Sequence, residues 1–551
     1  MNLLSRLASS TAVARALAWA GAVLSGVLLA LAFAPFEMSQ AAWVALVPLL
    51  LVILRSTPAQ AFRFGFCSGW VAWLVSLAWL LRLWQTSPES PVLLFLAWAA
   101  LAAYCALFTG AFAFTAAWAG ARLGRSTVLR STALAVLVPV IWVGFEYWRA
   151  MLFTGFGWDA VGTSQFRNLP LIQVAAWLGV YGVSFLVVFF SAGVALTLLR
   201  FAPAMRSGRY RPHPEFFLPV LAVVAAIHVG LGICRRPQQA ADFLTVAAVQ
   251  PAVAQVQKWT EAEERRILGL LRSLTTQALR ATPAPTLIIW PETATPQCVT
   301  QEGASRDLVV ELASAGVPLL VGSMDGEERE GVWRWWNGVF LFGADGQILD
   351  RYDKQHLVPF GEYFPLDGVI PGLRAFAPLG FSCTPGTRAT VFRVPGRTVT
   401  FSSLICFEDM MPELARRFVL RGARLLVNQT NDAWFDRSPE PMQHLSHSVF
   451  RAVENRVPVV RVANSGVTCW IDQAGGVHDA TRNSLRDAPS PAVRLWTVPL
   501  PATERPLTFY TRLGDLSFAL PCGTAAAVLC LVALVQQRSA RLIGRARAAE
   551  A

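Results

Sequence analysis

The sequence predicts a protein of two parts, a multi-span α-helical membrane part and an α/β layered part. The chain of 551 residues is 54% hydrophobic and only 15% charged, with a mean hydropathy of +0.45. Soluble globular proteins average about a quarter charged residues, so the missing charge indicates surface that faces lipid. Long apolar runs fill the first 236 residues. From about 237 to 512, short β-branched runs alternate with amphipathic stretches.

Apolar stretches near the roughly 20 residues that a membrane-spanning helix needs recur along the first part and once near the end. They lie at about 16–34, 64–81, 91–120, 131–148, 169–199, 216–234 and 516–536. A shorter stretch at 41–54 is a thin span, a tilted helix or a re-entrant segment. We therefore expect an N-terminal membrane domain over 1–236 with about seven transmembrane helices, an α/β domain over 237–512, and a closing transmembrane helix with a basic tail over 513–551.

Short arginine clusters alternate with arginine-poor loops between these stretches, provided that 41–54 counts as a span. The clusters contain Arg6 and Arg15; Arg55 and Arg63; Arg122, Arg125 and Arg130; Arg200, Arg206, Arg209 and Arg211; and Arg538, Arg541, Arg545 and Arg547. Because basic loops stay in the cytoplasm, both termini are expected there, and residues 235–515 on the other side. Glu146 and Arg149 could mark a polar pathway through the membrane, but they fall at the end of a span, where exposure at the membrane interface is easier and is the interpretation favoured here.

The charge and the cysteines argue against two kinds of partner. The net charge of +12 is concentrated in the loop clusters, so no nucleic-acid partner is expected. The nine cysteines lie mostly singly, without a CxxC pair, which argues against a zinc site and a disulfide framework, although Cys298 and Cys383 could bridge if oxidised. His444 and His447 have no third ligand motif nearby. We interpret them as surface or packing residues and expect no metal.

Strands and helices alternate through the α/β part, which predicts a layered fold with reactive residues at the carboxyl ends of strands. The predicted strands are 242–250, 285–292, 317–323, two within 336–354, 398–409 and 424–430, and the predicted helices are 260–279, 307–316 and 411–423. A turn at Asp345-Gly346 joins the two strands within 336–354, so the sheet is expected to be partly antiparallel.

Three reactive side chains follow such strands: Glu292, Lys354 and Cys406. A thiol needs a base to become a nucleophile, and a carboxylate can serve. A lysine can stabilise the oxyanion of a tetrahedral intermediate. Together they form a set for acyl transfer that needs neither a metal nor an organic cofactor. Taken alone, however, a cysteine that ends an apolar strand is usually only a small buried side chain.

Four motifs that surround these residues favour the catalytic interpretation. WPET (290–293), YDKQHLVPFGEYFP (352–365), ICFED (405–409) and NDAWF (431–435) occur in this order. They resemble the nitrilase superfamily, whose fold is an α-β-β-α sandwich. Combined with the membrane spans, the chain resembles the apolipoprotein N-acyltransferase family over essentially its whole length.

This resemblance implies a role for each matching residue. It makes Glu292 the general base, Cys406 the nucleophile and Lys354 the oxyanion-stabilising cation. It also implies a supporting role for Glu362 and Glu408, and substrate contact for Trp259, Phe407 and Trp434, with core packing as the alternative for the two tryptophans.

The resemblance also implies the substrates and the location. A phospholipid, typically phosphatidylethanolamine, would give its acyl chain to Cys406, and the α-amine of a diacylated apolipoprotein would receive it. The enzyme would be a multi-pass protein of the bacterial inner membrane, with the catalytic domain facing the periplasm.

Some alternatives stay open at this point. The stretches 332–337 (VWRWWN) and 369–381 either contact the membrane or are buried loops. A membrane-tethered amidase could use the same three residues on a small amide, with water as the acceptor. A transporter with a non-catalytic nitrilase-like domain is a second rival, although the spans contain few ionisable residues.

Overall fold

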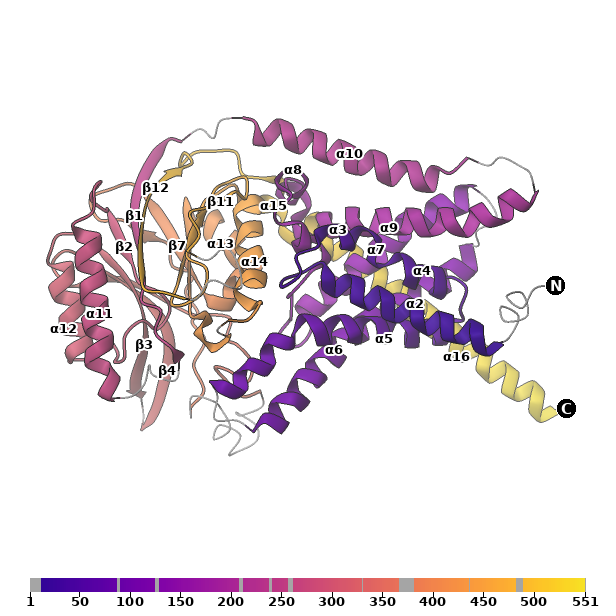
Figure 1. The fold of residues 1–551 in the computed structure, drawn as a ribbon, viewed down its shortest axis with the longest axis horizontal. Coiled ribbons are helices and arrows are strands. Elements are labelled where there is room, and N and C mark those ends of the chain that lie inside the picture. Colours follow the sequence, from indigo (N-terminus) through magenta and orange to yellow (C-terminus); the bar gives the residue numbers. More distant parts are fainter. Residues whose placement is uncertain are drawn as a thin grey trace. The chain divides into compact units, whose positions relative to one another are not determined.

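The computed structural model describes residues 11–86, 90–123, 128–207, 212–236, 240–255, 261–329, 331–365, 381–435, 437–481 and 489–550. Its contacts divide the chain into two compact units (Figure 1). The helical unit comprises Met1–Ala78, Phe95–Gly232 and Asp515–Ala551. The α/β unit comprises Trp79–Leu94 and Ile233–Gly514.

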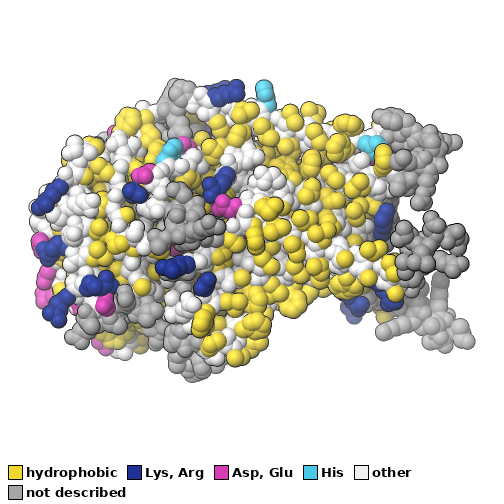
Figure 2. Space-filling model, viewed as in Figure 1, with side chains coloured by type: hydrophobic (Ala, Val, Ile, Leu, Met, Phe, Trp, Pro, Cys, Tyr) yellow, Lys and Arg dark blue, Asp and Glu magenta, His cyan; other side chains and the backbone are white. Residues whose placement is uncertain are grey.

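Among the described residues, seven helices are long and apolar enough to cross a membrane. They are α2 (Thr11–Leu31), α5 (Pro58–Ser76), α6 (Pro91–Leu123), α7 (Val128–Met151), α9 (Ala175–Ser207), α10 (Pro214–Cys234) and α16 (Ala519–Glu550). The apolar stretches that the sequence analysis placed at spanning length lie largely within them. Large hydrophobic side chains such as Leu24, Leu129, Leu221 and Val535 are exposed on these helices. Figure 2 shows such side chains covering the visible face of the helical unit, which is what a lipid-facing surface requires.

The short apolar stretch at 41–54 forms two helices, α3 (Ser39–Ala45) and α4 (Val47–Ile53), which meet at Leu46. Leu46, Leu49 and Leu50 are buried, and α4 packs against α2, α5 and α9. This stretch is therefore an internal part of the helical bundle. Its crossing of the membrane stays a prediction.

The closing helix α16 packs closely against α7. A Cβ on Gly144 of α7 would lie 2.4 Å from the Cβ of Ala526 and 2.5 Å from the carbonyl oxygen of Cys522. Only glycine permits this approach, and small residues at helix contacts are the usual way in which membrane helices pack. The end of the chain is thus built into the helical unit.

Glu146 and Arg149 are buried within the helical unit, with exposed fractions of 6% and 4%, so the expected interfacial exposure was wrong. Arg149 Nη1 donates to the carbonyl oxygens of Phe156 and Trp158, each at 2.7 Å. Glu146 Oε1 accepts the amide of Val161 at 2.8 Å. The two side chains hold the loop that follows α7, because it supplies the partners that they need away from water.

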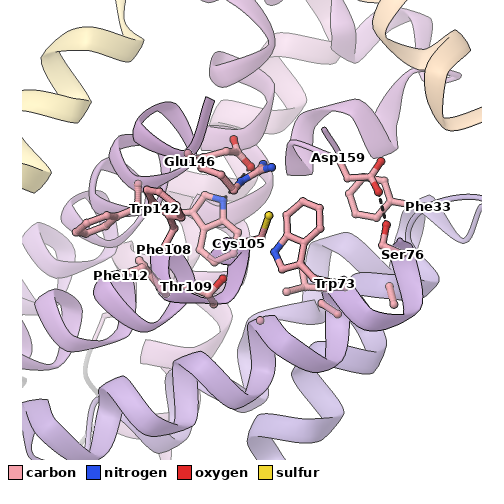
Figure 3. Close-up of a pocket in the computed structure, with 16 residues that line it drawn as sticks. Phe33, Trp73, Ser76, Cys105, Phe108, Thr109, Phe112, Trp142, Glu146 and Asp159 are labelled. Carbon is pink, nitrogen blue, oxygen red and sulfur yellow. Dashed lines mark hydrogen bonds between the residues drawn. The ribbon is translucent and has the colours of Figure 1, made fainter. Parts of the chain in front are cut away.

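A cavity of about 50 Å³ lies beside this cluster, between α2, α5, α6 and α7 (Figure 3). Its wall is mainly apolar and aromatic, and includes Trp73 and Phe108. The Arg149 guanidinium lies 4.5 Å from the centre of the Trp73 ring. Asp159 borders the cavity and accepts a hydrogen bond from Ser76 Oγ.

The described part of the α/β unit contains two six-stranded sheets, in the orders β12-β1-β2-β3-β4-β5 and β11-β10-β9-β8-β7-β6. The strands are β1 (Asp242–Gln250), β2 (Leu287–Ile289), β3 (Leu319–Arg329), β4 (Val332–Phe342), β5 (Ile348–Asp353), β6 (Phe392–Arg393), β7 (Thr400–Ile405), β8 (Leu425–Thr430), β9 (Val459–Ala463), β10 (Cys469–Ile471), β11 (Val477–His478) and β12 (Ala492–Leu500). Neither β6 nor β9 to β12 was predicted from the sequence. β12 pairs antiparallel with β1 and forms one edge of the first sheet.

Helices cover the outer faces of both sheets, which gives the α-β-β-α sandwich that the resemblance implied (Figure 1). Those of the first sheet are α11 (Glu261–Leu279) and α12 (Ala304–Ala313), and those of the second are α13 (Pro412–Leu420) and α14 (Glu440–Asn455). The amphipathic sequence of α11 explains its place, because Ile267, Leu271 and Ala278 are buried in the core with β-strand residues.

Strand direction brings two predicted site residues to one edge of the first sheet. β1, β2 and β3 are parallel, β4 runs antiparallel to β3, and β5 runs antiparallel to β4. β5 therefore points in the same direction as β2. The residues that follow β2 and β5 therefore lie at the same edge of the sheet. The turn at Asp345-Gly346, where Gly346 has φ 72°, reverses the chain between β4 and β5.

A segment that follows α5 belongs to the α/β unit. It begins with the short helix η1 (Ala78–Gln85). Trp79 Nε1 donates to Gln443 Oε1 at 2.9 Å, and its ring meets that of Phe435 edge-on. Thr86 Oγ1 donates to the carbonyl oxygen of Trp434 at 3.0 Å. The segment thus packs against the NDAWF motif, although it lies outside the two sheets and the helices that cover them.

Candidate active site

Glu292, Lys354 and Glu362 form a compact buried cluster at the edge of the first sheet. Lys354 Nζ lies 2.8 Å from Glu362 Oε2 and 3.5 Å from Glu292 Oε1. Burial lowers the pKa of Lys354, but the charges of Glu362 and Glu292 outweigh it and raise the pKa well above its ordinary value. The lysine is therefore a fixed cation, as stabilisation of an oxyanion requires.

Asn337 joins the two carboxylates and was missed by the sequence analysis. Its Nδ2 donates to Glu292 Oε1 at 2.7 Å and to Glu362 Oε1 at 2.8 Å. Its backbone carbonyl oxygen accepts the backbone amide of Lys354 at 2.9 Å. The only signal in the sequence was an asparagine in the apolar strand 336–342, because a buried amide on a strand needs polar partners.

Gly322 of β3 lets the chain approach Glu292. A Cβ at this position would lie 2.2 Å from the carbonyl oxygen of Pro291 and 2.8 Å from Cα of Glu292. Since such distances are far below ordinary contact, any larger residue would displace the end of the WPE motif. This is a second contribution to the site from the middle of a strand.

Cys406 lies where β7 ends and the 3-10 helix η5 (Cys406–Met410) begins. Its φ of 51° lies in the left-handed region, which costs a non-glycine residue on the order of 1–3 kcal/mol. Two donors hold its carbonyl oxygen: Asn428 Nδ2 at 3.0 Å and His444 Nε2 at 3.2 Å. The surroundings thus maintain a strained backbone at the predicted nucleophile.

The Cys406 thiol interacts electrostatically with the carboxylate–lysine cluster. Burial and the charge of Glu292 raise the pKa of the thiol to about 12, while Lys354 and His444 lower it. The thiol is therefore protonated at neutral pH. A group that takes up this proton is required before the sulfur can attack, and Glu292 is the acidic side chain with the largest effect on it.

Glu408 is fully buried beneath the site and accepts several hydrogen bonds. The amides of Ile405 and Gln355 donate to it at 2.8 and 2.7 Å, and Tyr352 Oη at 2.8 Å. Burial raises the pKa of Glu408 to about 7, against the lowering effect of these donors and of Lys354. Its contacts tie β5, which Lys354 follows, to β7, which Cys406 follows.

The predicted aromatic positions differ in what the structure describes. The ring of Phe407 stacks on His356, with centroids 5.9 Å apart. Trp434 is half-buried in η6 (Asp432–Phe435). Trp259 lies outside the described residues, as does nearly all of 369–381. Within 332–337, Trp333 is 52% exposed and stacks on Trp335.

The two histidines of α14 are both buried, so of the two interpretations, surface or packing residues, the structure supports packing. Burial lowers the pKa of His447 to about 3. Burial and Arg461 also lower the pKa of His444, but Asp409 and Asp432 outweigh them and raise it well above its ordinary value. His444 therefore belongs to a network of buried charges.

This network contains Asp409, Asp432, His444 and Arg461. His444 Nε2 lies 2.9 Å from Asp409 Oδ1, and Arg461 Nη2 lies 3.0 Å from Asp432 Oδ2. Asp432, Glu440 and His444 are close enough to share a metal ion. However, Arg461 Nη2 lies only 2.9 Å from His444 Nδ1. The guanidinium already supplies the positive charge that these carboxylates need, so the cluster fits an ion-pair network better than a metal site.

Cys298 and Cys383 pack in one small apolar cluster of the α/β unit, together with Met324 and Leu357. Both are free thiols in this structure. Cys383 is close enough to the site for burial and Glu362 to raise its pKa to about 12.

Comparison with known proteins covers both units. The N-terminal domain of apolipoprotein N-acyltransferase matches residues 25–193, and the carbon-nitrogen hydrolase family matches residues 245–485. The apolipoprotein N-acyltransferase of Geobacter metallireducens is 37% identical over 520 residues, which cover 93% of this chain and 94% of that protein. The chain belongs to the apolipoprotein N-acyltransferase family. As a member it is an acyltransferase with a multi-pass membrane part.

A second curated relative agrees with this assignment. The apolipoprotein N-acyltransferase of Brucella melitensis is 33% identical over 447 residues, 78% of each chain. Among solved structures, a Saccharomyces cerevisiae protein of branch 10 of the nitrilase superfamily matches with a TM-score of 0.36 and 17% identity. That match covers 47% of this chain and 91% of the yeast chain.

Proposed function

We propose that this chain transfers a fatty acyl group from a membrane phospholipid to the α-amine of a diacylated apolipoprotein, through a thioester on Cys406. The observation that carries the proposal is the set of two buried residues, Glu292 and Lys354, and the partly buried Cys406 in a chain of this family. The donor proposed is phosphatidylethanolamine. No metal or organic cofactor takes part in the proposed steps.

The first half-reaction forms the thioester. Glu292 takes the proton of the Cys406 thiol, and the sulfur attacks the ester carbonyl carbon of the phospholipid. Lys354 stabilises the negative charge that develops on the carbonyl oxygen. When the tetrahedral intermediate collapses, the carbon–oxygen bond breaks. The leaving alkoxide takes the proton from Glu292 and departs as a lysophospholipid.

The second half-reaction regenerates the enzyme. The α-amine of the S-diacylglyceryl cysteine attacks the thioester carbon, and Glu292 takes up a proton from the nitrogen. The carbon–sulfur bond breaks, and the sulfur regains its proton from Glu292 as the amide is released. Because the two substrates react in turn on one cysteine, ping-pong kinetics are expected.

The proposed setting is the bacterial inner membrane, with the α/β unit in the periplasm. Support comes from the arginine clusters of the sequence and from the chemistry of the substrates, which are both anchored in lipid. Glu362, Asn337 and Glu408 support the site by orienting Lys354, Glu292 and the strand ends. Phe407 and Trp434 remain proposed substrate contacts.

Intact mass of the detergent-purified protein after incubation with phosphatidylethanolamine alone tests the thioester. We expect a fatty-acyl increment that the Cys406→Ala variant lacks. A diacylated lipopeptide with a free α-amine should discharge it, while the same lipopeptide with an acetylated amine should not.

Absence of both the increment and lysophospholipid would overturn the proposal. Discharge to water alone would favour an amidase, and transport that persists in Cys406→Ala would favour a transporter.

A further inference from the structure

His444 approaches the predicted nucleophile through the backbone. Its Nε2 lies 3.2 Å from the carbonyl oxygen of Cys406 and 2.9 Å from Asp409 Oδ1. Both neighbours are hydrogen-bond acceptors, so Nε2 carries a proton whether the ring is neutral or charged. The ring therefore donates toward Cys406 and cannot act there as a base.

The second donor to this carbonyl is anchored in the same network. Asn428 Nδ2 donates to the Cys406 carbonyl at 3.0 Å, and its Oδ1 accepts from Arg461 Nη1 at 2.8 Å. Arg461 also contacts Asp409 Oδ2 at 3.2 Å. Both donors to the Cys406 carbonyl are thus oriented by Asp409 and Arg461, which are completely buried.

The backbone that these donors hold is a strained one. Cys406 is a non-glycine residue with φ 51°, and left-handed geometry at a strand end turns the side chain out of the strand direction. Relaxation toward ordinary dihedral angles would move the carbonyl and the thiol together. A fixed carbonyl is therefore a means of fixing the direction of the sulfur.

We propose that His444 is a positioning residue, whose Nε2–H holds the Cys406 carbonyl and so keeps the thiol aimed at Glu292 and Lys354. The inference rests on the proposed role of Cys406 as the nucleophile. His444 touches neither substrate nor the reacting atoms, and its partners Asp409, Asp432, Glu440 and Arg461 come from η5, η6, α14 and β9.

The chain offers a matched control on the same helix. His447 is also buried on α14, one turn from His444. The test compares His444→Leu, His444→Gln and His447→Leu in the full-length protein. Glutamine keeps an N–H donor near the position of Nε2, whereas leucine removes it. Single-turnover acylation of Cys406 is followed by intact mass over a series of phosphatidylethanolamine concentrations.

We expect His444→Leu to lower the limiting acylation rate by about 10²-fold, the scale of a misplaced reacting group, without changing the half-saturating lipid concentration. His444→Gln should recover most of the rate, and His447→Leu should leave it nearly unchanged. A wild-type rate in His444→Leu, or a glutamine variant as slow as the leucine variant, would overturn the proposal. If His444→Leu does not fold, the glutamine variant decides alone: a rate near that of the wild type is expected, and a rate about 10²-fold lower would overturn the proposal.

A soluble ester separates this proposal from the proposed function. p-Nitrophenyl acetate can acylate a reactive cysteine without lipid, and its burst of nitrophenolate reports the same thiol. If wild-type protein gives the burst but takes no acyl group from phospholipid, the proposed donor is wrong. The burst rates of the His444 variants then still test the positioning role: the leucine variant should be slower than the glutamine variant. Equal burst rates in the wild type and both variants would refute the positioning role.

Discussion

Lys354 Nζ lies closer to Glu362 than to Glu292, at 2.8 Å against 3.5 Å. The lysine therefore has one carboxylate as its main ion-pair partner and leaves the other less tightly engaged. Asn337 keeps the two carboxylates at this spacing by donating to both. This division of roles leads to the first prediction.

Glu362→Gln should lower acyl transfer by about 10²-fold. Without its main partner, Lys354 is expected to pair with Glu292 and so to hold the base that the thiol needs. Asn337 and the backbone amide of Val358 donate to different oxygens of Glu362, and the glutamine side chain has only one oxygen. Steady-state transfer to a lipopeptide measures the effect. Glu413→Gln is the control, because that half-exposed carboxylate pairs with Arg416 at the surface and should change nothing. Equal activity of both variants would contradict the assignment.

Glu292→Gln should change the reactivity of the Cys406 thiol and the transfer activity in opposite directions. Burial and the charge of Glu292 raise the pKa of the thiol to about 12, so removal of that charge should lower the pKa. Alkylation by iodoacetamide at pH 8 should become faster, because more thiolate is present. Acyl transfer should fall by about 10²- to 10⁴-fold, since the proposed base is lost. Peptide mapping by mass spectrometry isolates Cys406 from the other cysteines. Slower alkylation of the variant would refute this electrostatic account.

Gly322→Ala should impair the site and the fold together. Its Cβ would meet the carbonyl oxygen of Pro291 at 2.2 Å, which should cost about 1–3 kcal/mol and shift Glu292. Thermal unfolding in detergent measures the loss of stability, and acyl transfer measures the effect on the site. Gly269 of α11 is the matched control, because a Cβ there meets nothing within 4 Å. Gly269→Ala in a helix should stabilise by about 0.5–1 kcal/mol and leave transfer unchanged.

Glu440 should make the protein less stable as the pH rises toward 7. Burial and the charge of Asp432 raise the pKa of Glu440 from 4.5 to about 7. The folded state thus holds this proton more tightly than the unfolded chain does. Its contribution to stability is fully present below about pH 4.5 and is lost as the pH rises through about 7. Glu440→Gln stays uncharged, so its melting temperature should fall less between pH 5 and pH 8 than that of the wild type. An identical fall in both would show that this carboxyl does not titrate in that range.

The proposed catalytic set could be named from the sequence because each member follows a local pattern. Glu292, Lys354 and Cys406 each follow an apolar strand, and strand periodicity is a property of neighbouring residues. The apolar runs of the helical unit were visible for the same reason, since a membrane span is a matter of length and composition.

Other contributions to the site were hidden because they depend on which strands become neighbours. Asn337 and Gly322 lie within strands of ordinary appearance, and their roles arise only when β3 and β4 pair beside the end of β2. The segment Trp79–Leu94 follows a membrane span, yet it packs on the NDAWF motif of the α/β unit. No local pattern encodes such contacts.

The sequence by itself determined the two-part architecture, the strand ends and the reactive groups that occupy them, because these follow from local hydrophobic patterns and from side-chain chemistry. Only the tertiary structure decided which charges are buried. Glu146 and Arg149 were expected to be exposed at a membrane interface, and His444 to lie at the surface or in the packed interior. All three are buried, with hydrogen-bond partners outside their own helices. Burial of a charge depends on whether the fold brings it a partner, because desolvation without one costs several kcal/mol.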